Sequence, residues 1–369
     1  MPGVEIVGHQ LAIDLTKLPE HLTKTAQKLT KRIEFESFNE KGANGYVLIG
    51  KNKLLDRKVV VKFYYWGDGA HMEPRLLSML ASPHVLKVDD AAAIDQSYAY
   101  FIAPFCDAGD LDDVIEANQI GVRKAVDMII DVATGASFIH SKGYIHRDLK
   151  PSNIFCDSNG RLLIGDFGSV VKKGDSGYAA TVSRHSLLYR TPEEIQSSRA
   201  YPQGDVYQLG VVLYQLLGGQ LPYEETAWLN SKELSAYEKL SKPDNQIYAN
   251  SIVEQKILKG KLLDFDSLPA WCPPELIALI KKCCKISVAV RLDSPSTLIA
   301  KLNNLRASLS DWRLEPEPVL YRGKAKIRVI ESGGKYSLEK MAAPGSAWRK
   351  VRSVQPCSLR DAVAAANLS

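Results

Sequence analysis

The sequence is poor in the features that mark membrane-spanning and secreted proteins. It contains no run of about eighteen apolar residues, so we expect no membrane-spanning helix. No apolar signal core follows the Met-Pro-Gly start, so we expect no secretion by that route. The six cysteines form neither a Cys-x-x-Cys pair nor a disulfide-framework spacing. We therefore expect free thiols in a reducing cytoplasm, with one of the adjacent Cys283 and Cys284 buried.

An excess of one charge is also absent from most of the chain. The sequence holds 47 Lys and Arg against 42 Asp and Glu, and residues 315–369 alone hold ten of the basic and five of the acidic ones. The formal net charge of +5 therefore belongs to this C-terminal segment. A hydrophobic content of 45% is typical of a globular protein, and 369 residues suit two or three compact units.

Polar side chains that could take part in catalysis are concentrated in one stretch, His146-Arg147-Asp148-Leu149-Lys150-Pro151-Ser152-Asn153. Asp166-Phe167-Gly168 begins thirteen residues after it. Phosphoryl transfer needs two acidic side chains, an amide and a lysine of this kind. One Asp orients and deprotonates a hydroxyl, a Lys neutralises the migrating group, and an Asn with a second Asp holds Mg²⁺. A chance loop with a polar cluster is the competing interpretation.

These motifs match the catalytic loop and the magnesium-binding motif of protein kinases. Over residues 34–305 the chain resembles the eukaryotic-type protein kinase superfamily, and a match of eight consecutive residues disfavours chance. The resemblance implies an α+β, bilobal protein-kinase fold within residues 34–310. Its β-rich small lobe would span 34–103 and its mainly helical large lobe 107–310.

The resemblance also implies ATP and Mg²⁺ as cofactors. Asp148 would be the catalytic base, and Lys150 would neutralise the phosphoryl group in transit. Asn153 and Asp166 would be the metal ligands. Lys62 and Glu73 would position the nucleotide.

The nucleotide-binding elements lie nearer the N-terminus. Gly42 and Gly45 match the second and third glycines of the kinase Gly-rich loop, while Glu40 stands where the first would be. Lys62 ends an apolar run and looks like the lysine that holds the α- and β-phosphates. Its charge needs a partner, and Glu73 is the expected one. Because Pro74 follows directly, Glu73 is expected near the start of a short helix.

By the same resemblance, the hinge after the strand 98–103 binds adenine through its backbone. Ala103 falls at the gatekeeper position, where most kinases carry a larger side chain. Asp110 would meet the ribose, and for Cys106 and Asp110 taken singly a purely structural role is the alternative. The residues expected to bind the nucleotide are Gly42, Gly45, Val47, Val60, Lys62, Ala103, Pro104, Cys106, Asp110 and Phe155.

The segment that begins at Asp166 ends in Thr191-Pro192-Glu193, which matches the A-P-E motif of kinases with Thr for Ala. A buried unpaired carboxylate is costly, so Glu193 is expected to pair with Arg291. Asp205, in a stretch that resembles D-V-W-S-L-G, is expected to cap the backbone of the catalytic loop. Ser186 aligns with the P+1 hydroxyl residue of kinases, and autophosphorylation is expected at Thr181 or Ser183.

Three regions fall outside the kinase pattern. Residues 1–33 contain a predicted helix, 18–32, which we expect to dock on the small lobe; a basic face for an acidic partner is the alternative. Residues 224–252 predict a surface insertion near the place where kinases often dock substrates, or a loop without function. Residues 315–369 predict a small basic, β-rich appendage, with strands 321–330, 335–341 and 347–354 and a helix 358–367.

The basic residues of this appendage have two interpretations. A solvated face on a domain packed against the kinase is the preferred one, and an acidic or nucleic-acid partner is the alternative. The residues concerned are Arg322, Lys324, Lys326, Arg328, Arg349, Lys350 and Arg352.

The predicted function is that of a serine/threonine protein kinase located in the cytoplasm. Lys150 favours Ser/Thr acceptors, because tyrosine kinases usually carry Ala-Ala-Arg or Arg-Ala-Ala after the catalytic Asp. A pseudokinase-like scaffold that binds partners without turnover is the alternative, favoured only by Glu40 and Pro74. Transfer to a small molecule or to RNA is a third interpretation, which the complete D-F-G to A-P-E segment disfavours.

Overall fold

A computed structural model describes residues 13–39, 45–65, 80–117, 120–180 and 186–369. The chain divides into two compact units. The first unit contains the residues up to Asp107 together with Asp166–Val170, and the second contains Ala108–Gly165 and Val171–Ser369. Asp166-Phe167-Gly168 thus belongs to the first unit, whereas the stretch 146–153 belongs to the second.

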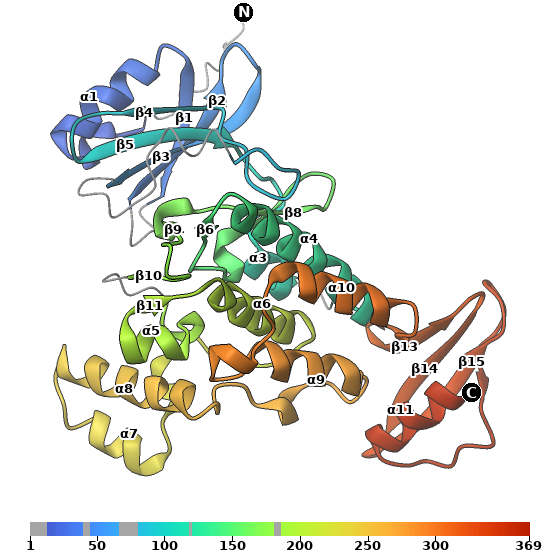
Figure 1. Ribbon diagram of the computed structural model, residues 1–369. Helices are drawn as coiled ribbons and strands as arrows, with labels where there is room; N and C mark the ends of the chain where they lie inside the picture. Colours follow the sequence, from blue (N-terminus) through green and yellow to red (C-terminus); the bar gives the residue numbers. More distant parts are fainter. Residues whose placement is uncertain (1–12, 40–44, 66–79, 118–119, 181–185) are drawn as a thin grey trace, which may run out of the picture. The chain divides into compact units, whose positions relative to one another are not determined.

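The first unit is built on a five-stranded antiparallel sheet with the strand order β1-β2-β3-β5-β4 (Figure 1). Val59, Val61 and Phe63 of β3 are buried in alternation, as expected for a strand with one face on a core. The strands are β1 (Ile33–Asn39), β2 (Tyr46–Asn52), β3 (Arg57–Tyr65), β4 (Asp90–Ala93) and β5 (Tyr98–Pro104).

Helix α1 (Glu20–Leu29) covers part of this core, after the short 3-10 helix η1 (Leu15–Lys17). Leu22, Ala26 and Leu29 recur at helical spacing and join the hydrophobic cluster of the sheet. The expected docking of the N-terminal helix is therefore confirmed. The helix is shorter than the predicted range 18–32, because Pro19 is its N-cap and residues 30–32 form a turn.

Helix α6 (Pro202–Leu216) is the centre of the second unit, since every residue from Gly204 to Leu216 is buried. Helices α4 (Val122–Ser141) and α9 (Pro274–Cys283) pack against it, and α10 (Pro295–Arg306) lies along α4 (Figure 1). The five-stranded sheet of the first unit, this helical body and a further C-terminal sheet make up the α+β fold class that the sequence predicts.

Short helices and strands flank the loops of the second unit. The stretch 146–153 runs from β6 to β7 and ends in the 3-10 helix η3, and α3 pairs with that region. The elements are α3 (Leu111–Ala117), β6 (Tyr144–Ile145), η3 (Pro151–Asn153), β7 (Ile154–Cys156), β8 (Leu162–Ile164), β9 (Val171–Lys172), β10 (Ala179–Ala180), η5 (Leu187–Tyr189), α5 (Pro192–Ser197) and β11 (Arg199–Ala200). In the first unit, η4 (Phe167–Ser169) follows Asp166.

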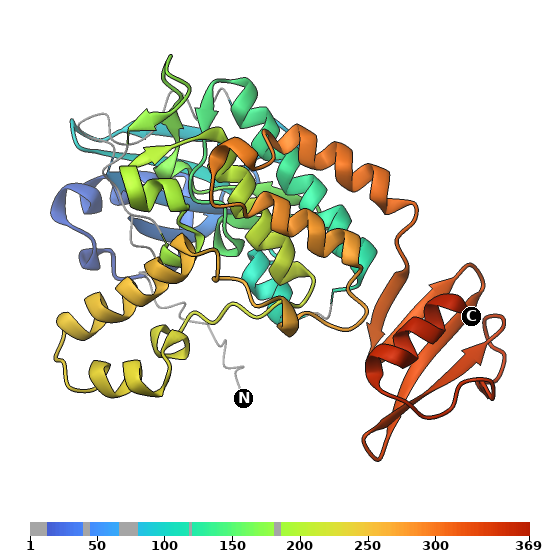
Figure 2. The same cartoon turned by 60° about the horizontal axis from the view of Figure 1, so that its bottom comes forward.

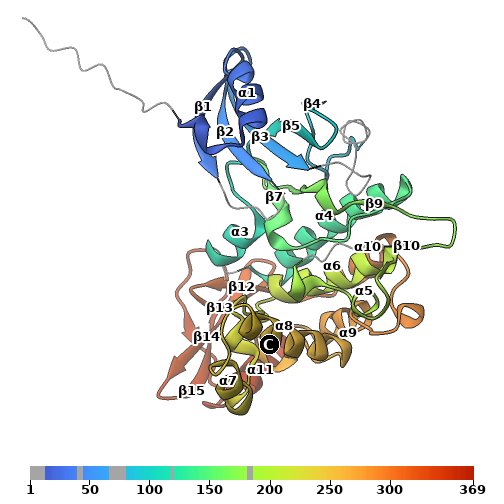
Figure 3. The ribbon, with the colours of Figure 1, turned by 90° about the vertical axis from the view of Figure 1, so that its left-hand side faces the viewer.

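The insertion 224–252 is mostly helical. It contains the 3-10 helix η6 (Glu225–Trp228), α7 (Ser231–Tyr237) and the first part of α8 (Asp244–Leu258). A capping box between Asn230 and Glu233 begins α7. Helix α8 packs on η6, α5, η5 and α7, and α7 and α8 lie together in Figure 3. The insertion is therefore packed next to the segment that contains Leu187 and Tyr189.

The C-terminal segment forms a five-stranded antiparallel sheet in sequence order, and α11 (Leu359–Leu368) lies across β14 and β15 (Figure 2). The strands are β12 (Asp311–Glu315), β13 (Glu317–Arg322), β14 (Ala325–Ser332), β15 (Lys335–Met341) and β16 (Arg349–Lys350). The predicted strand 335–341 is confirmed as β15, and the predicted helix is confirmed with ends shifted by one residue.

Two predicted strands of this segment are wrong in extent. A turn at Gly323, whose φ is 61°, divides the range 321–330 into β13 and β14. Basic residues continue the alternating pattern through that turn, so the pattern hides it. The range 347–354 contains only β16, and β12 precedes the range that the sequence predicts.

Basic side chains of this sheet have partners within it. Arg328 Nη2 lies 2.6 Å from Glu339 Oε2, and its guanidinium stacks 4.5 Å from the Trp348 ring. Lys326 Nζ lies 3.3 Å from Glu315 Oε2. The contacts of Arg328 and Lys326 thus lie within the sheet, and they give no support to a nucleic-acid partner.

Trp312 of β12 joins the sheet to the helical body. It is fully buried, its ring centroid lies 6.4 Å from that of Trp271, and its indole Nε1 donates to Asn367 Oδ1 at 3.1 Å. Arg123 of α4 donates through Nε and Nη2 to the carbonyl of Leu309, just before β12. The sheet is therefore part of the packing of the second unit.

We expect Trp312→Ala to lower the free energy of unfolding by about 3–5 kcal/mol, because it removes a buried aromatic side chain and leaves a cavity. Urea denaturation followed by circular dichroism measures this loss. Leu368→Ala removes an 89% exposed side chain of the same segment and should change the stability little. Equal stability of the two variants would contradict a structural role for Trp312.

All six cysteines are free, Cys283 is buried and Cys284 is partly exposed, as predicted. In the described part of the chain, no helix has the length and the apolar character needed to cross a bilayer.

Candidate functional site

Lys62 on β3 and Asp166 form an ion pair in the first unit. Lys62 Nζ lies 2.6 Å from Asp166 Oδ1, and both side chains are largely buried. Asp166 has a φ of 51° and accepts a hydrogen bond from the Gly168 N–H at 3.4 Å. The left-handed backbone of a non-glycine residue is costly and is typical of functional positions. The structure thus brings together two residues that the sequence assigns to nucleotide and metal binding.

The other predicted nucleotide residues of this unit lie along neighbouring strands. Val47 is opposite Lys62 in the β2–β3 ladder, and Val60 is opposite Ala103 in the β3–β5 ladder. Ala103 is fully buried. Pro104 ends β5, and Cys106 follows it as a partly exposed residue.

Gly45 lies directly before β2 and has a φ of 146°. A Cβ at this position would lie 2.0 Å from the carbonyl oxygen of Phe63, so only glycine fits. Gly42, Glu40, Glu73 and Pro74 lie outside the described residues, and the expected Lys62–Glu73 pair stays a prediction.

In the second unit, Asp205 of α6 binds the backbone of the stretch 146–153. Its carboxylate accepts the backbone N–H of His146 at 2.9 Å and that of Arg147 at 2.8 Å. His140 Nε2 lies 2.6 Å from Asp205 Oδ2. Burial acts to raise the pKa of Asp205, but the hydrogen bond and charge of His140 and the Arg147 N–H bring the pKa below its ordinary value. The predicted capping role of Asp205 is confirmed.

A second residue of α6, Gln208, holds the same loop and was missed in the sequence. Its Oε1 accepts the Leu149 N–H at 2.8 Å, and its Nε2 donates to the carbonyl oxygens of Arg147 at 2.6 Å and Tyr189 at 3.0 Å. These bonds hold Arg147, which has a φ of 72°, in a strained conformation. The signal that could have identified Gln208 is an amide side chain within a largely apolar helix.

Asp148, Asn153 and Lys150 come together at the end of this loop. Asn153 Nδ2 donates to Asp148 Oδ2 at 2.8 Å and to its backbone carbonyl at 2.8 Å. Lys150 Nζ lies 3.1 Å from Asp148 Oδ2 and donates to Ser186 Oγ at 2.5 Å. Four residues that the sequence assigns to phosphoryl transfer or acceptor recognition thus form one cluster.

The second carboxylate oxygen of Asp148, Oδ1, is buried and has no hydrogen-bond partner among the described residues. A buried acceptor without a partner costs about 1–3 kcal/mol, so its retention calls for a function. A hydroxyl that donates to Oδ1 would satisfy it. This is the geometry needed for a base that removes a proton from an acceptor hydroxyl.

Phe155 of β7 follows Asn153 by two residues and forms an isolated bridge with Asp110. Burial raises the pKa of the Asp110 carboxyl, and hydrogen bonds from the backbone of Asp113 and Asp112 act to lower it. The structure therefore brings together the two residues of the second unit that the sequence assigns to the nucleotide.

Asn153 of the second unit and Asp166 of the first unit each carry an oxygen donor of the kind that a hard divalent cation prefers. Asn153 uses Nδ2 for Asp148, which leaves its amide oxygen Oδ1 for another interaction. Asp166 offers carboxylate oxygens. Amide and carboxylate oxygens are the ligands that Mg²⁺ prefers, so the residues fit the ion that the sequence implies.

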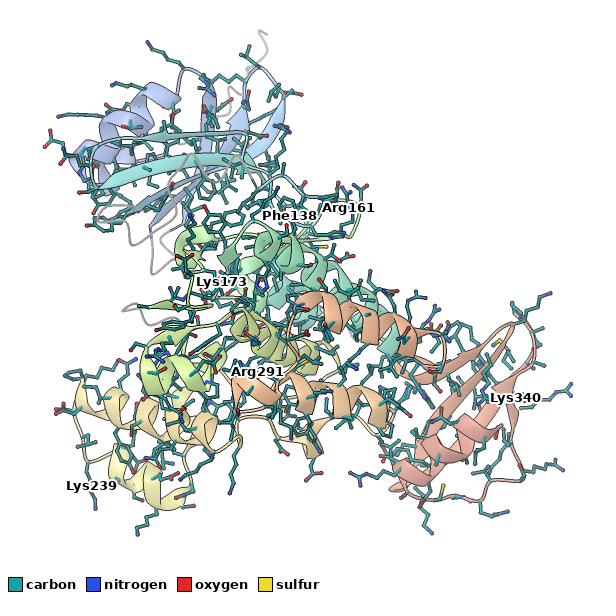
Figure 4. The ribbon with its side chains drawn as sticks, in the orientation of Figure 1. Phe138, Arg161, Lys173, Lys239, Arg291 and Lys340 are labelled. Atoms are coloured by element: carbon teal, nitrogen blue, oxygen red, sulfur yellow. The ribbon has the colours of Figure 1, made fainter. Side chains whose placement is uncertain are left out.

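Glu193 at the start of α5 forms a buried, bidentate pair with Arg291. Arg291 Nη1 lies 2.7 Å from Glu193 Oε1, and Nη2 lies 2.8 Å from Oε2. Figure 4 labels Arg291 among the packed helices of this unit. The predicted pair is confirmed across a large separation in sequence.

Glu194, the next residue, contacts the predicted catalytic loop and was also missed. Its Oε1 lies 3.2 Å from Arg147 Nε, and its Oε2 accepts the Thr191 hydroxyl at 3.1 Å. Burial raises the pKa of Glu194, while the charge of Arg147 acts to lower it. The signal in the sequence was Thr191-Pro192-Glu193-Glu194, the spacing of a helix-capping box. Thr191 in place of Ala thus orients Glu194 toward Arg147.

Comparison with known proteins points in the same direction. A family model described as "Protein kinase domain" matches residues 41–301. Maternal embryonic leucine zipper kinase of Danio rerio is 28% identical over 270 residues, which cover 70% of this chain and 36% of that protein.

Two further relatives are similar over comparable ranges. The interferon-induced, double-stranded RNA-activated protein kinase of Mus musculus is 28% identical over 270 residues, covering 66% of this chain and 50% of that protein. Serine/threonine-protein kinase PrkC of Bacillus subtilis (strain 168) is 28% identical over 235 residues, covering 60% of this chain and 36% of that protein. The chain thus matches half or less of the length of each of these relatives.

Proposed function

Because this chain belongs to the protein kinase domain family, we propose that it is a serine/threonine protein kinase that transfers the γ-phosphate of ATP to protein hydroxyls. The observation that carries the proposal is the Asp148 cluster. A buried carboxylate with one oxygen free to accept a proton, fixed by Asn153 and next to the Lys150 ammonium, suits an acceptor hydroxyl and a migrating phosphoryl group.

Each side chain has a role in this proposal. The Asp148 carboxylate accepts the hydroxyl proton and aligns the oxygen on the γ-phosphorus. The Lys150 ammonium offsets the charge of the group in transit, and the Lys62 ammonium holds the α- and β-phosphates. Asn153 and Asp166 would hold Mg²⁺, which supplies charge neutralisation at the phosphate oxygens when it is bound. Glu73 would orient Lys62.

The proposed nucleotide site uses the residues that resemble the family's adenine and phosphate contacts. Gly45 supports it, because it lies just before β2 and a backbone without a Cβ can come close to phosphate oxygens. Val47 and Val60 would cover the adenine, Phe155 would form its floor, and Asp110 would meet the ribose. Gly42, Ala103, Pro104 and Cys106 complete the set.

The choice of Ser or Thr as acceptor is supported by Lys150 and Ser186. Lys150 Nζ donates a 2.5 Å hydrogen bond to the hydroxyl of Ser186, the residue that aligns with the P+1 position of kinases. Tyrosine kinases usually lack this lysine. Relatives with serine/threonine kinase in their names, such as that of Bacillus subtilis, also support this choice. Six free cysteines are consistent with the proposed cytoplasmic location.

Autophosphorylation belongs to the same proposal. Thr181 and Ser183 lie outside the described residues, in the segment between Asp166 and Glu193. A phosphate there would add nearly two negative charges for Arg147 and for Lys172 or Lys173 to meet. In the structure, Arg147 Nε lies 3.2 Å from Glu194 Oε1.

Incubation with γ-labelled ATP, Mg²⁺ and a cell lysate, followed by mass-spectrometric site mapping, tests this function. We expect label on Ser and Thr of lysate proteins and on Thr181 or Ser183 of the protein itself. A protein that binds ATP but transfers no label to any acceptor would support the pseudokinase-like scaffold instead. Label on lipid, metabolite or RNA alone would support the third interpretation.

We expect the protein as it stands to use N6-benzyl ATP, and Ala103→Met to abolish this use while ATP use is retained. Ala103 is fully buried opposite Val60, and a methionine there would add three heavy atoms at the edge of the proposed adenine site. Val60 narrows the face of that site and not its edge. Steady-state rates with both nucleotides measure the effect. Equal analogue use by both forms would contradict the gatekeeper assignment.

A further inference from the structure

The second unit contains a pocket of about 380 Å³ that extends from the predicted catalytic loop to the insertion 224–252. Lys150 and Ser186 line one end of it. Asp112 of α3 lines it together with Tyr223, Glu225 and Trp228, of which the last two belong to η6. A volume of this size is within the range of small-ligand sites and suits a few side chains of a peptide.

The end at Lys150 adjoins the place where an acceptor hydroxyl would react. Lys150 Nζ is 3.1 Å from Asp148 Oδ2, and the buried Oδ1 of Asp148 lacks a partner among the described residues. A peptide whose hydroxyl satisfies Oδ1 would therefore have its neighbouring residues at the mouth of this pocket.

Two aromatic rings and two carboxylates line the part of the pocket formed by α3, Tyr223 and η6. The Tyr223 hydroxyl donates to Asp112 Oδ1 at 2.6 Å, and the Trp228 indole Nε1 donates to the Pro222 carbonyl at 3.0 Å. Gln246 Nε2 donates to Glu225 Oε1 at 2.8 Å. These bonds fix the two rings and the two carboxylates before any ligand binds, which lowers the entropic cost of binding.

The pocket is short of positive charge. Of the described residues that line it, only Lys150 is basic, and Asp148 and Ser186 already bind that ammonium. Burial raises the pKa of Asp112, and the charges of Asp110, Glu116 and Asp113 raise it further, although the Tyr223 hydrogen bond opposes them. A cation placed beside Asp112 would relieve this repulsion.

We propose that this pocket is a subsite that binds a basic side chain, preferably arginine, close in sequence to the Ser or Thr that is phosphorylated. The assignment rests on the proposed function. A guanidinium can stack on the Tyr223 and Trp228 rings while it hydrogen-bonds to Asp112 and Glu225, and its methylene stem can lie along the apolar wall of the pocket. An acidic side chain would be repelled by the same carboxylates.

A peptide series tests the assignment. Each peptide carries one Ser and one Arg, and the Arg is moved through the positions that flank the Ser; matched peptides carry Gln or Glu in place of Arg. With MgATP we expect kcat/KM for the best Arg peptide to exceed that for its Gln partner roughly tenfold, mainly through KM. Fluorescence anisotropy of the same labelled peptides should give a similar ratio of Kd values without turnover.

Variants of two adjacent glutamates locate the effect. Glu225→Gln should reduce the Arg-to-Gln ratio about tenfold, and Glu225→Lys should make the Glu peptide the preferred one. Glu224→Gln is the matched control, because Glu224 is exposed, lies outside the pocket lining and loses the same charge. It should keep the ratio of the unmodified protein.

The outcomes separate this assignment from the proposed function. Transfer to peptides with ratios near one at every position would overturn the subsite alone. Equal loss of preference in Glu225→Gln and Glu224→Gln would also overturn it, because the effect would then come from general surface charge. Absence of transfer to every peptide, together with equal Kd values, would overturn both.

Discussion

Replacing Asp148 with Asn is expected to lower the rate of phosphoryl transfer about 10³-fold or more while the fold stays intact. The substitution keeps the size of the side chain and an oxygen that can accept from Asn153, but it removes the charge that binds the acceptor proton and pairs with Lys150. Groups that act on developing charge in a low-dielectric site commonly contribute effects of this size. Single-turnover transfer from γ-labelled ATP measures the loss.

Two comparisons show whether the loss is chemical. Asp157→Asn removes a carboxylate that pairs with Arg161 in the turn between β7 and β8, and it should leave the rate close to that of the unmodified protein. Lys62→Ala and Asp166→Ala should each reduce transfer as strongly as Asp148→Asn, since the nucleotide phosphates and the metal would lose their ligands. Undiminished turnover in Asp148→Asn would contradict the role of this residue as the base.

The cluster around Asp148 could be predicted from sequence because one short motif contains it. Asp148, Lys150 and Asn153 are so close along the chain that their spacing nearly determines their proximity. The Asp205 contacts and the Glu193–Arg291 pair were predicted across longer separations, and this was achieved through resemblance to a family. Nothing local at Arg291 identifies its partner.

Gln208 and Glu194 show where such prediction ends. Each contacts the backbone or a side chain of a loop that is distant in sequence. Each also lies in a motif in which the sequence analysis assigned a role to another residue, Asp205 or Glu193. The turn at Gly323 was missed for another reason. Residues 322–328 alternate polar and apolar on both sides of the glycine, so the period of a strand continues through the place where the chain reverses.

The N-terminal helix and the C-terminal sheet were predictable as elements but not in their packing. The apolar residues at helical spacing in α1 predicted which face of this helix is buried. Trp312 precedes the segment 315–369 that the sequence sets apart, although it is one of the largest fully buried side chains. Its burial depends on Trp271 and Asn367, and no pattern in the sequence connects these three residues.

Arg291→Met is expected to lower the free energy of unfolding of this protein by about 3–5 kcal/mol, among the largest losses for a single substitution outside the Asp148 cluster. All five N–H donors of the guanidinium are used. Nη1 and Nη2 bind Glu193, and the carbonyl oxygens of Gln203, Ile286 and Lys285 accept the other three. Methionine fills much of the space but leaves a buried carboxylate without a counter-charge.

The physical cause of the loss can be isolated with three more variants. Arg306 pairs with Asp127 at 2.5 Å through the same chemistry, but both side chains are more than 40% exposed. Water and salt screen that pair, so Arg306→Met should cost about 1 kcal/mol or less. Glu193→Gln combined with Arg291→Met should recover part of the loss, because the double variant no longer buries an unpaired charge. If urea denaturation gives Arg291→Met and Arg306→Met the same midpoint, the buried pair does not stabilise the second unit. If it gives the predicted order, the cost of an unpaired carboxylate explains why Glu193 and Arg291 occur together.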